Sequence, residues 1–441
     1  MKIIEGFQSA KLVLSRQIPT EFYPTPLTPE LEPKILPALN KAEREVRKII
    51  DNVRDQGDKA LINFTSKYDG IELTSLEVSK QQIASAYREV DSELVSALKL
   101  AAERIRSFHT AQKERILSGA TKPGSGQLIR PLERVGIYVP GGTVPYPSTV
   151  LMTVIPAKVA GVSEVILVTP PSAKRTVPPS ILVAADIAGV DRVFSVGGAQ
   201  AIAALAFGTE SIPRVDKICG PGNIFVTLAK RLVYGAVGID GLQGPSEVLI
   251  IADETTNPEY CAADLLAQAE HDPLASAILI TTSRGLADEV NREVKQQLKN
   301  LPRQAIATES LNSRGKIVVV TDVDEAIELA NLYAPEHLCL MVDRATSYID
   351  KISSAGCIFL GENSTVVLGD YVAGPSHVLP TGGTARFSSP LSIMDFIKFI
   401  NMVDVDEADL KQLGQAAITM ARAEGLEAHA RAMEKRLGGN F

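Results

Sequence analysis

The pattern of apolar and polar positions divides the chain into helical stretches near both ends and an alternation of strands and helices between them. Residues 39–70 and 93–112 carry apolar side chains at helical spacing, with charged side chains on the remaining positions. This spacing predicts amphipathic helices. Residues 407–439 repeat the pattern, whereas residues 19–37 are rich in proline and are predicted to be an arm or linker.

In the middle of the chain, short runs of β-branched and other apolar residues alternate with segments of helical length. The predicted strands span residues 134–139, 164–169, 192–196, 247–252, 277–281, 316–320, 337–342 and 357–360. Such continuous apolar runs are typical of parallel strands buried on both faces, and their alternation with helices predicts βαβ units. The segments VAGVSEVILV (159–168) and IAGVDRVFSV (187–196) repeat this unit at an offset of 28 residues.

Two groups of predicted strands, before and after about residue 245, indicate two parallel sheets. We therefore expect an α/β protein with two parallel-sheet domains, a crevice between them, and helical arms toward the N- and C-terminal ends. The length of 441 residues suggests about two to four domains, which agrees with this division.

Composition excludes several classes of protein. The chain has 45 basic and 52 acidic residues, a net charge of −7, and only 5% aromatic residues, so a nucleic-acid partner is not expected. No apolar run approaches the roughly 20 residues that a membrane-spanning helix needs, and Glu5 and Lys11 interrupt the region where a signal peptide would be apolar. The four cysteines form no C-x-x-C motif and predict a reducing compartment. We expect a cytoplasmic protein without membrane contacts.

Two short motifs place polar side chains where a metal ion could bind. In QAEH, Gln268 and His271 lie three residues apart near the end of a predicted helix and so share one face. In GDYVAGPSH, Asp370 and His377 lie in a loop bounded by glycines, and His429 lies on the tail helix. A Gln/His/Asp/His set suits zinc. Spacing alone is a weak signal for a metal, and polar helix ends and a capped loop explain it at least as well, so both interpretations stay open.

The motif APEHL places two titratable residues next to each other at the start of a predicted strand. Glu336 and His337 follow Pro335, which ends a helix, and lead directly into residues 337–342. Side chains at a strand end beside a crevice are well placed for proton transfer, for which histidine is the usual base near pH 7. The alternative is a helix C-terminus closed by Pro335, with His337 bonding to the last carbonyl groups.

Glycine-rich turns follow three of the predicted strands, although the chain has no G-x-G-x-x-G fingerprint. These turns are VPGG (139–142), VGGAQ (196–200) and CGPGN (219–223). Glycines at such positions let a ligand approach backbone N–H groups closely, which favours a nucleotide or another anion over plain turns. The segment QGPSE (243–247) places Ser246 at the crevice, but without the G-x-S-x-G elbow of a serine hydrolase.

Taken together, these motifs resemble the histidinol dehydrogenase family, and the resemblance runs nearly from end to end. The motifs that carry it are IYVPGG (137–142), GGAQAIAALAFGT (197–209), DKICGPGN (216–223), GPSEVLIIAD (244–253), DLLAQAEHDP (264–273), APEHL (334–338), GDYVAGPSHVLPT (369–381), ARFSSPL (385–391) and AEGLEAH (423–429). No single motif identifies the family, but this many motifs in this order do.

The resemblance implies an NAD-dependent, zinc-containing enzyme that oxidises L-histidinol through L-histidinal to L-histidine. It implies zinc ligands at Gln268, His271, Asp370 and His429. It implies substrate contacts at Ser246, Gln268, His271, His337, Asp370, Glu424 and His429. It implies cofactor contacts at Tyr138, Gln200 and Asn223. In this scheme His337 accepts the hydroxyl proton as hydride leaves, and Glu336 activates water for the second oxidation.

The resemblance also implies a domain-swapped homodimer with incomplete Rossmann-like domains. Its implied parts are an N-terminal arm (1–36), an α/β domain with the metal and catalytic residues (37–133 and 246–380), an NAD-binding domain (134–245), and a C-terminal helical arm (381–441) that completes the partner's site. A shared site would explain why candidate ligands lie on a terminal helix.

Four positions depart from the family pattern. The run STVVLGDY replaces a Thr-Pro-Glu-Ala type of run, and Ser376, Phe225 and Gln243 replace the usual asparagine, tyrosine and alanine. The first two departures lie near the substrate and leave open a related zinc- and NAD-dependent enzyme that oxidises another alcohol, such as a sulfonated diol. The carboxylate of Glu424, which suits the positive end of an amino alcohol, favours histidinol.

Two further classes of function fit less well. A zinc-dependent hydrolase that uses Glu336 and a metal-bound water would need no nucleotide and would leave the three glycine turns unexplained. A catalytically silent scaffold would have no need for Glu336, His337 and the candidate ligands, all of which are present.

Overall fold

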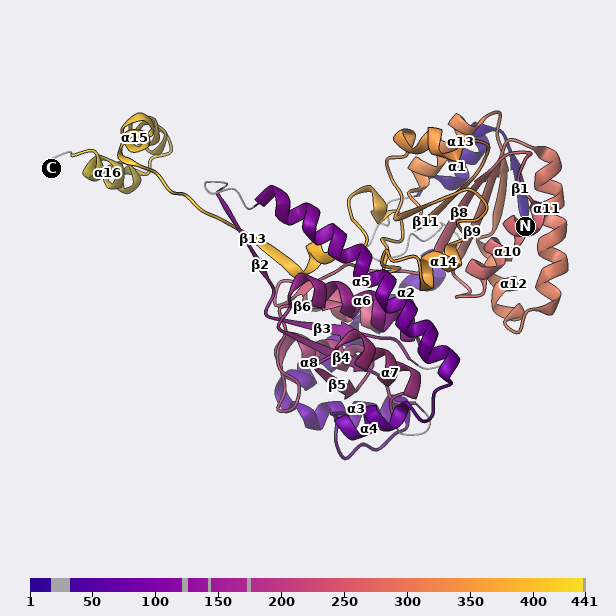
Figure 1. Ribbon diagram of the computed structural model, residues 1–441, viewed down its shortest axis with the longest axis horizontal. Helices are drawn as coiled ribbons and strands as arrows, with labels where there is room; N and C mark the ends of the chain where they lie inside the picture. Colours follow the sequence, from indigo (N-terminus) through magenta and orange to yellow (C-terminus); the bar gives the residue numbers. More distant parts are fainter. Residues whose placement is uncertain (17–31, 121–125, 142–143, 173–175, 439–441) are drawn as a thin grey trace. The chain divides into compact units, whose positions relative to one another are not determined.

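The computed structural model describes residues 1–16, 32–120, 126–141, 144–172 and 176–438 (Figure 1). The chain separates into two compact units, each of which is described by itself. The first comprises Met1–Lys113 and Pro131–Ile397, and the second Glu114–Arg130 and Lys398–Phe441. In the described part of the chain, no helix is long and apolar enough to cross a membrane.

A five-stranded parallel sheet forms one half of the first unit, in the order β5-β4-β3-β6-β7. Its strands are β3 (Arg134–Tyr138), β4 (Glu164–Thr169), β5 (Arg192–Ser195), β6 (Lys217–Cys219) and β7 (Gly238–Ile239). Strand order reverses at β3, which lies between β4 and β6. The loops after β3 and β6 therefore diverge and leave a crevice at the carboxyl ends of the strands.

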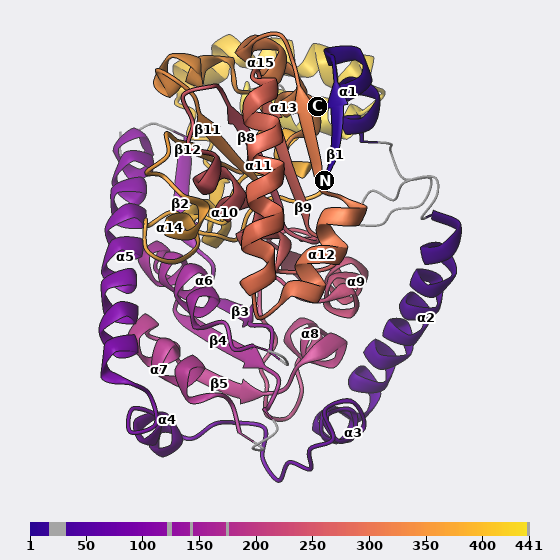
Figure 2. The ribbon, with the colours of Figure 1, turned by 90° about the vertical axis from the view of Figure 1, so that its right-hand side faces the viewer.

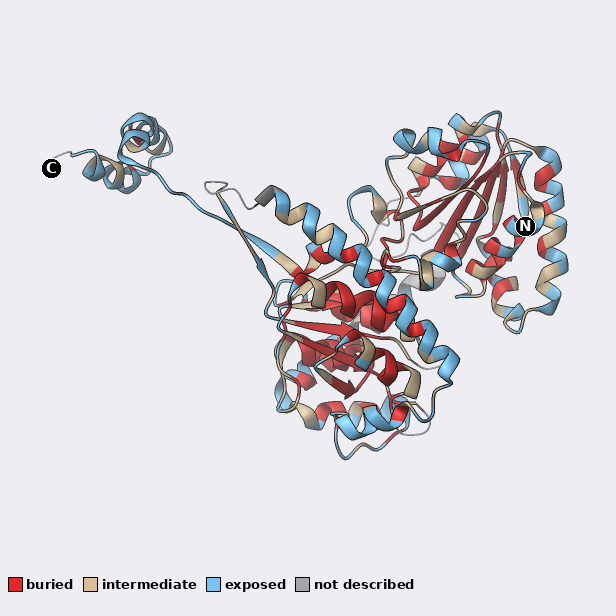
Figure 3. Cartoon of the chain, in the orientation of Figure 1, coloured by how far each residue is buried: buried red, intermediate tan, exposed pale blue. Residues whose placement is uncertain are grey.

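Helices cover both faces of this sheet, and its strands are buried (Figure 3). These helices are α2 (Glu32–Gln56), α3 (Asp58–Asp69), α4 (Lys80–Ala86), α5 (Ser92–Ala120), α6 (Pro147–Ala160), α7 (Pro179–Ala188), α8 (Gly198–Phe207) and α9 (Ile224–Val233). Helices α8 and α9 pack on each other and on α2, whereas α6 packs on α7, and α7 on α4.

A six-stranded parallel sheet forms the other half of the first unit, in the order β1-β10-β9-β8-β11-β12 (Figure 2). Its strands are β1 (Lys2–Glu5), β8 (Glu247–Ala252), β9 (Ser276–Thr281), β10 (Lys316–Val319), β11 (His337–Met341) and β12 (Cys357–Leu360). The register pairs His337 with Val248, so the catalytic candidates at the amino end of β11 lie beside the amino end of β8.

Alternate residues of the second sheet fill two separate cores. Val248 and Ile250 of β8 pack with α10 (Pro258–Ala269), α11 (Arg284–Gln297) and α12 (Gln304–Ser313). Leu249 and Ile251 pack on the other face with α1 (Phe7–Leu14) and α13 (Val323–Tyr333). The continuous apolar run 247–252 thus follows from burial of both faces.

The second unit contains a two-stranded ribbon and a helical hairpin. The strands are β2 (Gln127–Pro131) and β13 (Ile397–Asn401), and the helices are α15 (Glu407–Ala423) and α16 (Glu427–Arg436). The helices meet at Gly425, whose φ of 75° is left-handed and ends α15. Leu437 packs against Gly414 of α15, where a larger side chain would collide with it.

The structure confirms an α/β fold with two parallel sheets and all eight predicted strands, to within a residue or two at their ends. The helical pattern of 39–70 forms two helices, α2 and α3, which separate at Gly57 with its positive φ. The linker prediction for 19–37 is wrong for 32–37, which begin α2: Pro33 lies in the first helical turn, where a proline loses no hydrogen bond, and the helix continues through Pro37. Residues 19–31 lie outside the described part.

Candidate active site

A cavity of about 800 Å³ lies within the first unit, between the carboxyl ends of the first sheet and the amino ends of the second. The first sheet contributes the loops after β3 and β6, which are the strands where its order reverses. The sequence-predicted residues that line the cavity are Ser246, Gln268, His271, Glu336, His337, Asp370, His377 and Asn223. The volume suits a small-molecule site.

His337 is held so that one ring nitrogen is fixed and the other is available. Its Nδ1 lies 2.8 Å from the backbone carbonyl of Glu247, which can only accept a hydrogen bond, so Nδ1 carries the proton. Its Nε2 lies 3.5 Å from Asp370 Oδ1 and has no hydrogen-bond partner among the described residues. His337 does not bond to the end of α13, so the helix-closing alternative is wrong. The lone pair of Nε2 can accept a proton.

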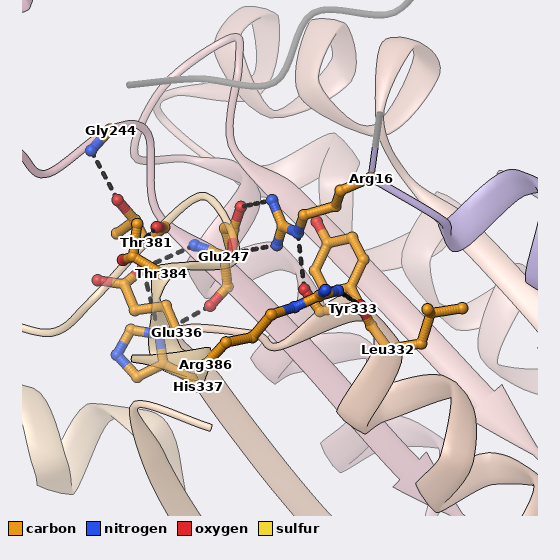
Figure 4. Close-up of polar contacts among 10 residues, drawn as sticks. All are labelled: Arg16, Gly244, Glu247, Leu332, Tyr333, Glu336, His337, Thr381, Thr384 and Arg386. Carbon is orange, nitrogen blue, oxygen red and sulfur yellow. Dashed lines mark hydrogen bonds and ion pairs between the residues drawn. The ribbon is translucent and has the colours of Figure 1, made fainter. Parts of the chain in front are cut away.

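Glu336 lies beside this imidazole and is nearly as buried, with 6% of Glu336 and 4% of His337 exposed. Glu336 Oε2 accepts the N–H of Glu247 at 2.7 Å (Figure 4). Burial raises the pKa of the Glu336 carboxyl. Burial lowers the pKa of His337, but the carboxylates of Glu336 and Asp370 more than offset this and raise it. Both groups are therefore stronger bases than their free counterparts.

Three candidate metal ligands come from two helices that meet at the cavity. Gln268 and His271 lie at the end of α10, and Asp370 lies on α14 (Val366–Tyr371). Gln268 is 3% exposed, and its Nε2 has no hydrogen-bond partner in the described structure. Burial lowers the pKa of His271, against the opposing charge of Asp370. The described residues contain no group of three or more His, Cys, Asp or Glu side chains arranged as a metal site.

His377, which sequence spacing left open as a ligand, uses both ring nitrogens for contacts within the protein. Nδ1 lies 2.8 Å from the backbone carbonyl of Asp370, and Nε2 lies 3.3 Å from Thr149 Oγ1 on α6. The neighbouring Ser376 donates its hydroxyl to the carbonyl of Met152, also on α6. These residues anchor the Asp370 loop to the first sheet's helices.

Glu424 and His429 belong to the second unit, whereas the other candidates belong to the first. Glu424 follows the last residue of α15, and His429 lies in the first turns of α16. Both side chains are exposed.

Of the three candidate cofactor residues, Asn223 lines the cavity, and the other two do not. Asn223 caps α9 by accepting the N–H groups of Phe225 and Val226 at 3.1 and 3.2 Å. Tyr138 and Gln200 are buried, and the Tyr138 hydroxyl accepts the N–H of Gly198 at 3.2 Å. Burial raises the pKa of Tyr138 to about 12.

Packing alone explains one of the glycines in these turns. Gly220 has a φ of 114°, and a Cβ there would lie 2.1 Å from the carbonyl oxygen of Tyr138. Cys219, next to it, is buried, and burial raises its pKa well above the ordinary value, as expected for a small apolar core residue.

The residue that holds the catalytic candidates, Glu247, was not among the predicted site residues. The backbone of Glu247 bonds to both Glu336 and His337, and its carboxylate pairs with Arg16. Backbone contacts leave no side-chain signature, and Arg16 is 231 residues away in the chain, so neither motif nor spacing could indicate this arrangement.

Comparisons with known proteins agree over nearly the whole chain. The family model described as histidinol dehydrogenase matches residues 37–437. A histidinol dehydrogenase of Dehalococcoides mccartyi strain CBDB1 is 57% identical over 438 residues, which cover 99% of this chain and 100% of the relative. One of Clostridium acetobutylicum is 52% identical over 89% of this chain and 92% of the relative. The crystal structure of histidinol dehydrogenase from Elizabethkingia anophelis superimposes with a TM-score of 0.87 at 38% identity, covering 99% of this chain and 98% of that one.

Proposed function

The chain belongs to the histidinol dehydrogenase family of NAD-dependent oxidoreductases, and from this membership we propose that it oxidises L-histidinol through L-histidinal to L-histidine. These are the last steps of histidine biosynthesis. One observation supports His337 as the catalytic base: its Nε2 has no hydrogen-bond partner among the described residues and lies in a cavity lined by the candidate zinc ligands. Another alcohol on the same scaffold is not favoured, because relatives 52–57% identical over most of their length bear the histidinol dehydrogenase name.

The two bases divide the chemistry between them. In the first oxidation, Nε2 of His337 accepts the hydroxyl proton, while Nδ1 stays bonded to Glu247 and keeps the ring oriented. In the second, Glu336 in its ionised form removes a proton from the water that adds to the aldehyde. Bound NAD+ supplies the hydride acceptor in each step.

The residues present fit a zinc ion. Gln268 lines the cavity beside His271 and Asp370, and its buried Nε2 has no hydrogen-bond partner among the described residues, so the amide turned by 180° would place its oxygen there without losing a bond. Amide oxygen, imidazole nitrogen and carboxylate oxygen are donors that zinc accepts. We propose these three as ligands, with His429 of a second copy as the fourth. Bound zinc would hold the imidazole and amine of the substrate and so orient its carbinol carbon.

We further propose that the C-terminal hairpin of a second copy completes each site, in a domain-swapped homodimer. Glu424 and His429 are exposed on the second unit. The same hairpin exposes apolar side chains, with Leu413 55% and Met420 64% exposed, which a partner surface would cover. In this proposal Ser246, His337 and Glu424 contact the substrate together with the ligand residues.

The NAD site is proposed for the five-stranded sheet, residues 134–245, as the sequence indicated. Its supporting feature is the reversal of strand order at β3, where open parallel sheets bind dinucleotides. Asn223 reaches the cavity, and Tyr138 and Gln200 lie at the end of β3 and in the first turn of α8. A cytoplasmic location stays a prediction from the sequence.

Stoichiometry tests the proposed reaction. Zinc-loaded protein given L-histidinol and NAD+ is expected to form two NADH for each histidinol consumed, with L-histidine as product. A chelator should remove the ion from Gln268, His271 and Asp370 and abolish the activity. Added zinc should restore it. No NADH from histidinol, together with turnover of another alcohol, would move the specificity to the altered residues around 365 and 376.

A hydrogen bond links the two helices that carry the proposed ligands. Thr365 Oγ1 donates to Asp264 Oδ1 at 2.8 Å. Thr365 caps α14, which bears Asp370, and Asp264 lies one helical turn before Gln268 on α10. Thr365 belongs to the run STVVLGDY that departs from the family pattern, yet it does not line the cavity. At Thr365, the departure from the family pattern therefore affects the contacts that hold the proposed zinc ligands, and not the cavity wall.

Replacing Thr365 with valine is expected to weaken zinc binding about tenfold, because contacts behind metal ligands typically contribute 10–100-fold. Zinc affinity is measured by competition with a chromogenic chelator. The control is Thr365→Ser, which keeps the hydroxyl and should bind zinc as the unmodified protein does. Equal affinities of the valine and serine variants would contradict the role.

A further inference from the structure

The N-terminal segment contacts the residues that hold the proposed catalytic pair, Glu336 and His337. This segment precedes residue 37, where the match to the family model begins. Strand β1 pairs with β10 at the edge of the second sheet, and α1 packs on α13. The chain after α1 then brings Arg16 to the amino ends of the strands. There its Nη1 and Nη2 donate to the two carboxylate oxygens of Glu247 at 2.8 and 2.6 Å (Figure 4).

Arg16 also holds the helix that leads into the catalytic pair. Its Nε donates to the carbonyl of Tyr333, the last residue of α13, at 2.6 Å, and its guanidinium lies 3.8 Å from the centre of the Tyr333 ring. Ala334, which follows, has a left-handed φ of 52° that a non-glycine residue adopts only when its surroundings impose it. Pro335 and then Glu336 continue directly from this turn.

The two elements that Arg16 joins are the ones that flank Glu336 and His337. On one side, α13 delivers the pair through the strained turn at Ala334. On the other, the backbone of Glu247 bonds to both, its N–H to Glu336 Oε2 and its carbonyl to His337 Nδ1. A planar guanidinium with donors on two edges can bridge both elements at once, which a lysine ammonium cannot do in the same geometry.

The arrangement is enclosed, which fixes the geometry of the pair. The side chains of Arg16 and Glu247 are 12% and 7% exposed. Gly383 passes over the arginine stem with a φ of 84°, and a Cβ there would lie 2.8 Å from Arg16 Cδ. A buried bidentate ion pair keeps a fixed geometry that an exposed pair does not.

We propose that Arg16 is a positioning residue for the oxidation, which acts through Glu247 and the end of α13 to hold Glu336 and His337 in the orientation for proton transfer. This inference rests on the proposed function for the reaction that it serves. It adds to that function a contribution from the N-terminal segment. Arg16 itself does not line the cavity and touches no proposed ligand or substrate position.

The test replaces the guanidinium while avoiding an unpaired buried charge. In zinc-loaded protein, Arg16→Met/Glu247→Gln is expected to lower kcat for L-histidinol about 10- to 100-fold, the size expected when reacting groups are displaced by a fraction of an ångström to an ångström. KM for NAD+ and zinc content should stay within about twofold, and KM for histidinol should change much less than kcat, because Arg16 itself touches neither the proposed ligands nor the substrate position. Arg16→Lys should lose most of kcat as well, because it keeps the charge but not the fork.

The control is Lys11→Ala on α1, which removes the exposed ion pair to Glu328 from the same segment and should leave kcat unchanged. A folded double variant with the kcat of the unmodified protein overturns the proposal, as does an equal loss in Lys11→Ala. If the double variant does not fold, the kcat of Arg16→Lys is compared with that of the unmodified protein, and an unchanged kcat overturns the proposal.

A second readout separates this proposal from the reaction assigned to the chain. With ¹⁵N-histidine labelling, at a pH high enough to keep the imidazole neutral, His337 should show the pattern of a ring protonated at Nδ1, and the double variant should show mixed tautomers. This spectrum does not depend on turnover. If the unmodified protein fails to oxidise histidinol, the proposed function fails, while the tautomer shift still tests Arg16. An unchanged tautomer pattern in the folded variant would overturn the positioning role.

Discussion

Replacing His337 with asparagine is expected to lower kcat for L-histidinol oxidation about 10²- to 10⁴-fold, the usual contribution of a general base. The asparagine amide can still donate to the carbonyl of Glu247, as Nδ1 does at 2.8 Å. It has no group that could accept a proton at the position of Nε2. The substitution therefore removes the base and keeps the local hydrogen bond. Stopped-flow or steady-state NADH formation at 340 nm measures the loss, alongside zinc content and thermal unfolding.

The matched comparison is Glu336→Gln, which keeps an acceptor for the N–H of Glu247 and removes the carboxylate. If Glu336 serves the second oxidation, this variant should oxidise histidinol but turn over added L-histidinal poorly. His337→Asn should be impaired from the first oxidation onward. A His337→Asn protein that retains more than about a tenth of kcat, with full zinc content, would contradict the assignment of His337 as the base.

Much of the fold was predictable because its strands are buried on both faces. EVLIIA (247–252) is continuous in apolar residues because alternate members fill two different cores, and the prediction needs only that pattern. Strands β6 and β7, of three and two residues, were missed because their extended form depends on pairing with their neighbours in the sheet. The same holds for β1, which pairs only with β10.

The site was predictable where its signal is local. Gln268 and His271 share a helical face, Glu336 and His337 are adjacent, and both pairs line the cavity. The environment of each group was not predictable. His377 shares the polar, glycine-bounded loop with Asp370, but its ring nitrogens are both engaged within the protein.

The contribution of Arg16 depends on tertiary proximity across 231 residues, and a single sequence carries no signal for it. The burial of Tyr138 and Gln200 could not be predicted from the sequence either. Position in a motif does not tell whether a residue at a strand-end turn lines the cavity or is buried away from it. Sequence patterns thus predict elements and local groups, whereas orientation and burial follow from how distant segments pack.

Mixing two inactive variants is expected to restore activity if each site uses residues from two copies. In a swapped dimer of His337→Asn with His429→Ala, one site receives both defects and the other receives neither. Random reassortment makes half the dimers hybrid, each with one intact site of two, so about a quarter of full activity should return. Each variant alone should stay inactive, because one removes the proposed base and the other a proposed zinc ligand. NADH formation is followed after subunit exchange, which mass-tagged subunits quantify.

The control pair is His337→Asn with Asp370→Ala, both of which alter the first unit. Every hybrid site then keeps one defect, whichever copy supplies the hairpin, so no activity should return. Recovery confined to the pair with His429→Ala would place His429 in the partner's site, where its exposure on α16 leaves it available. Complete exchange without recovery would mean that each chain supplies its own hairpin. In that case the exposed apolar side chains of α15, such as Leu413 and Met420, would have to be covered within the same chain.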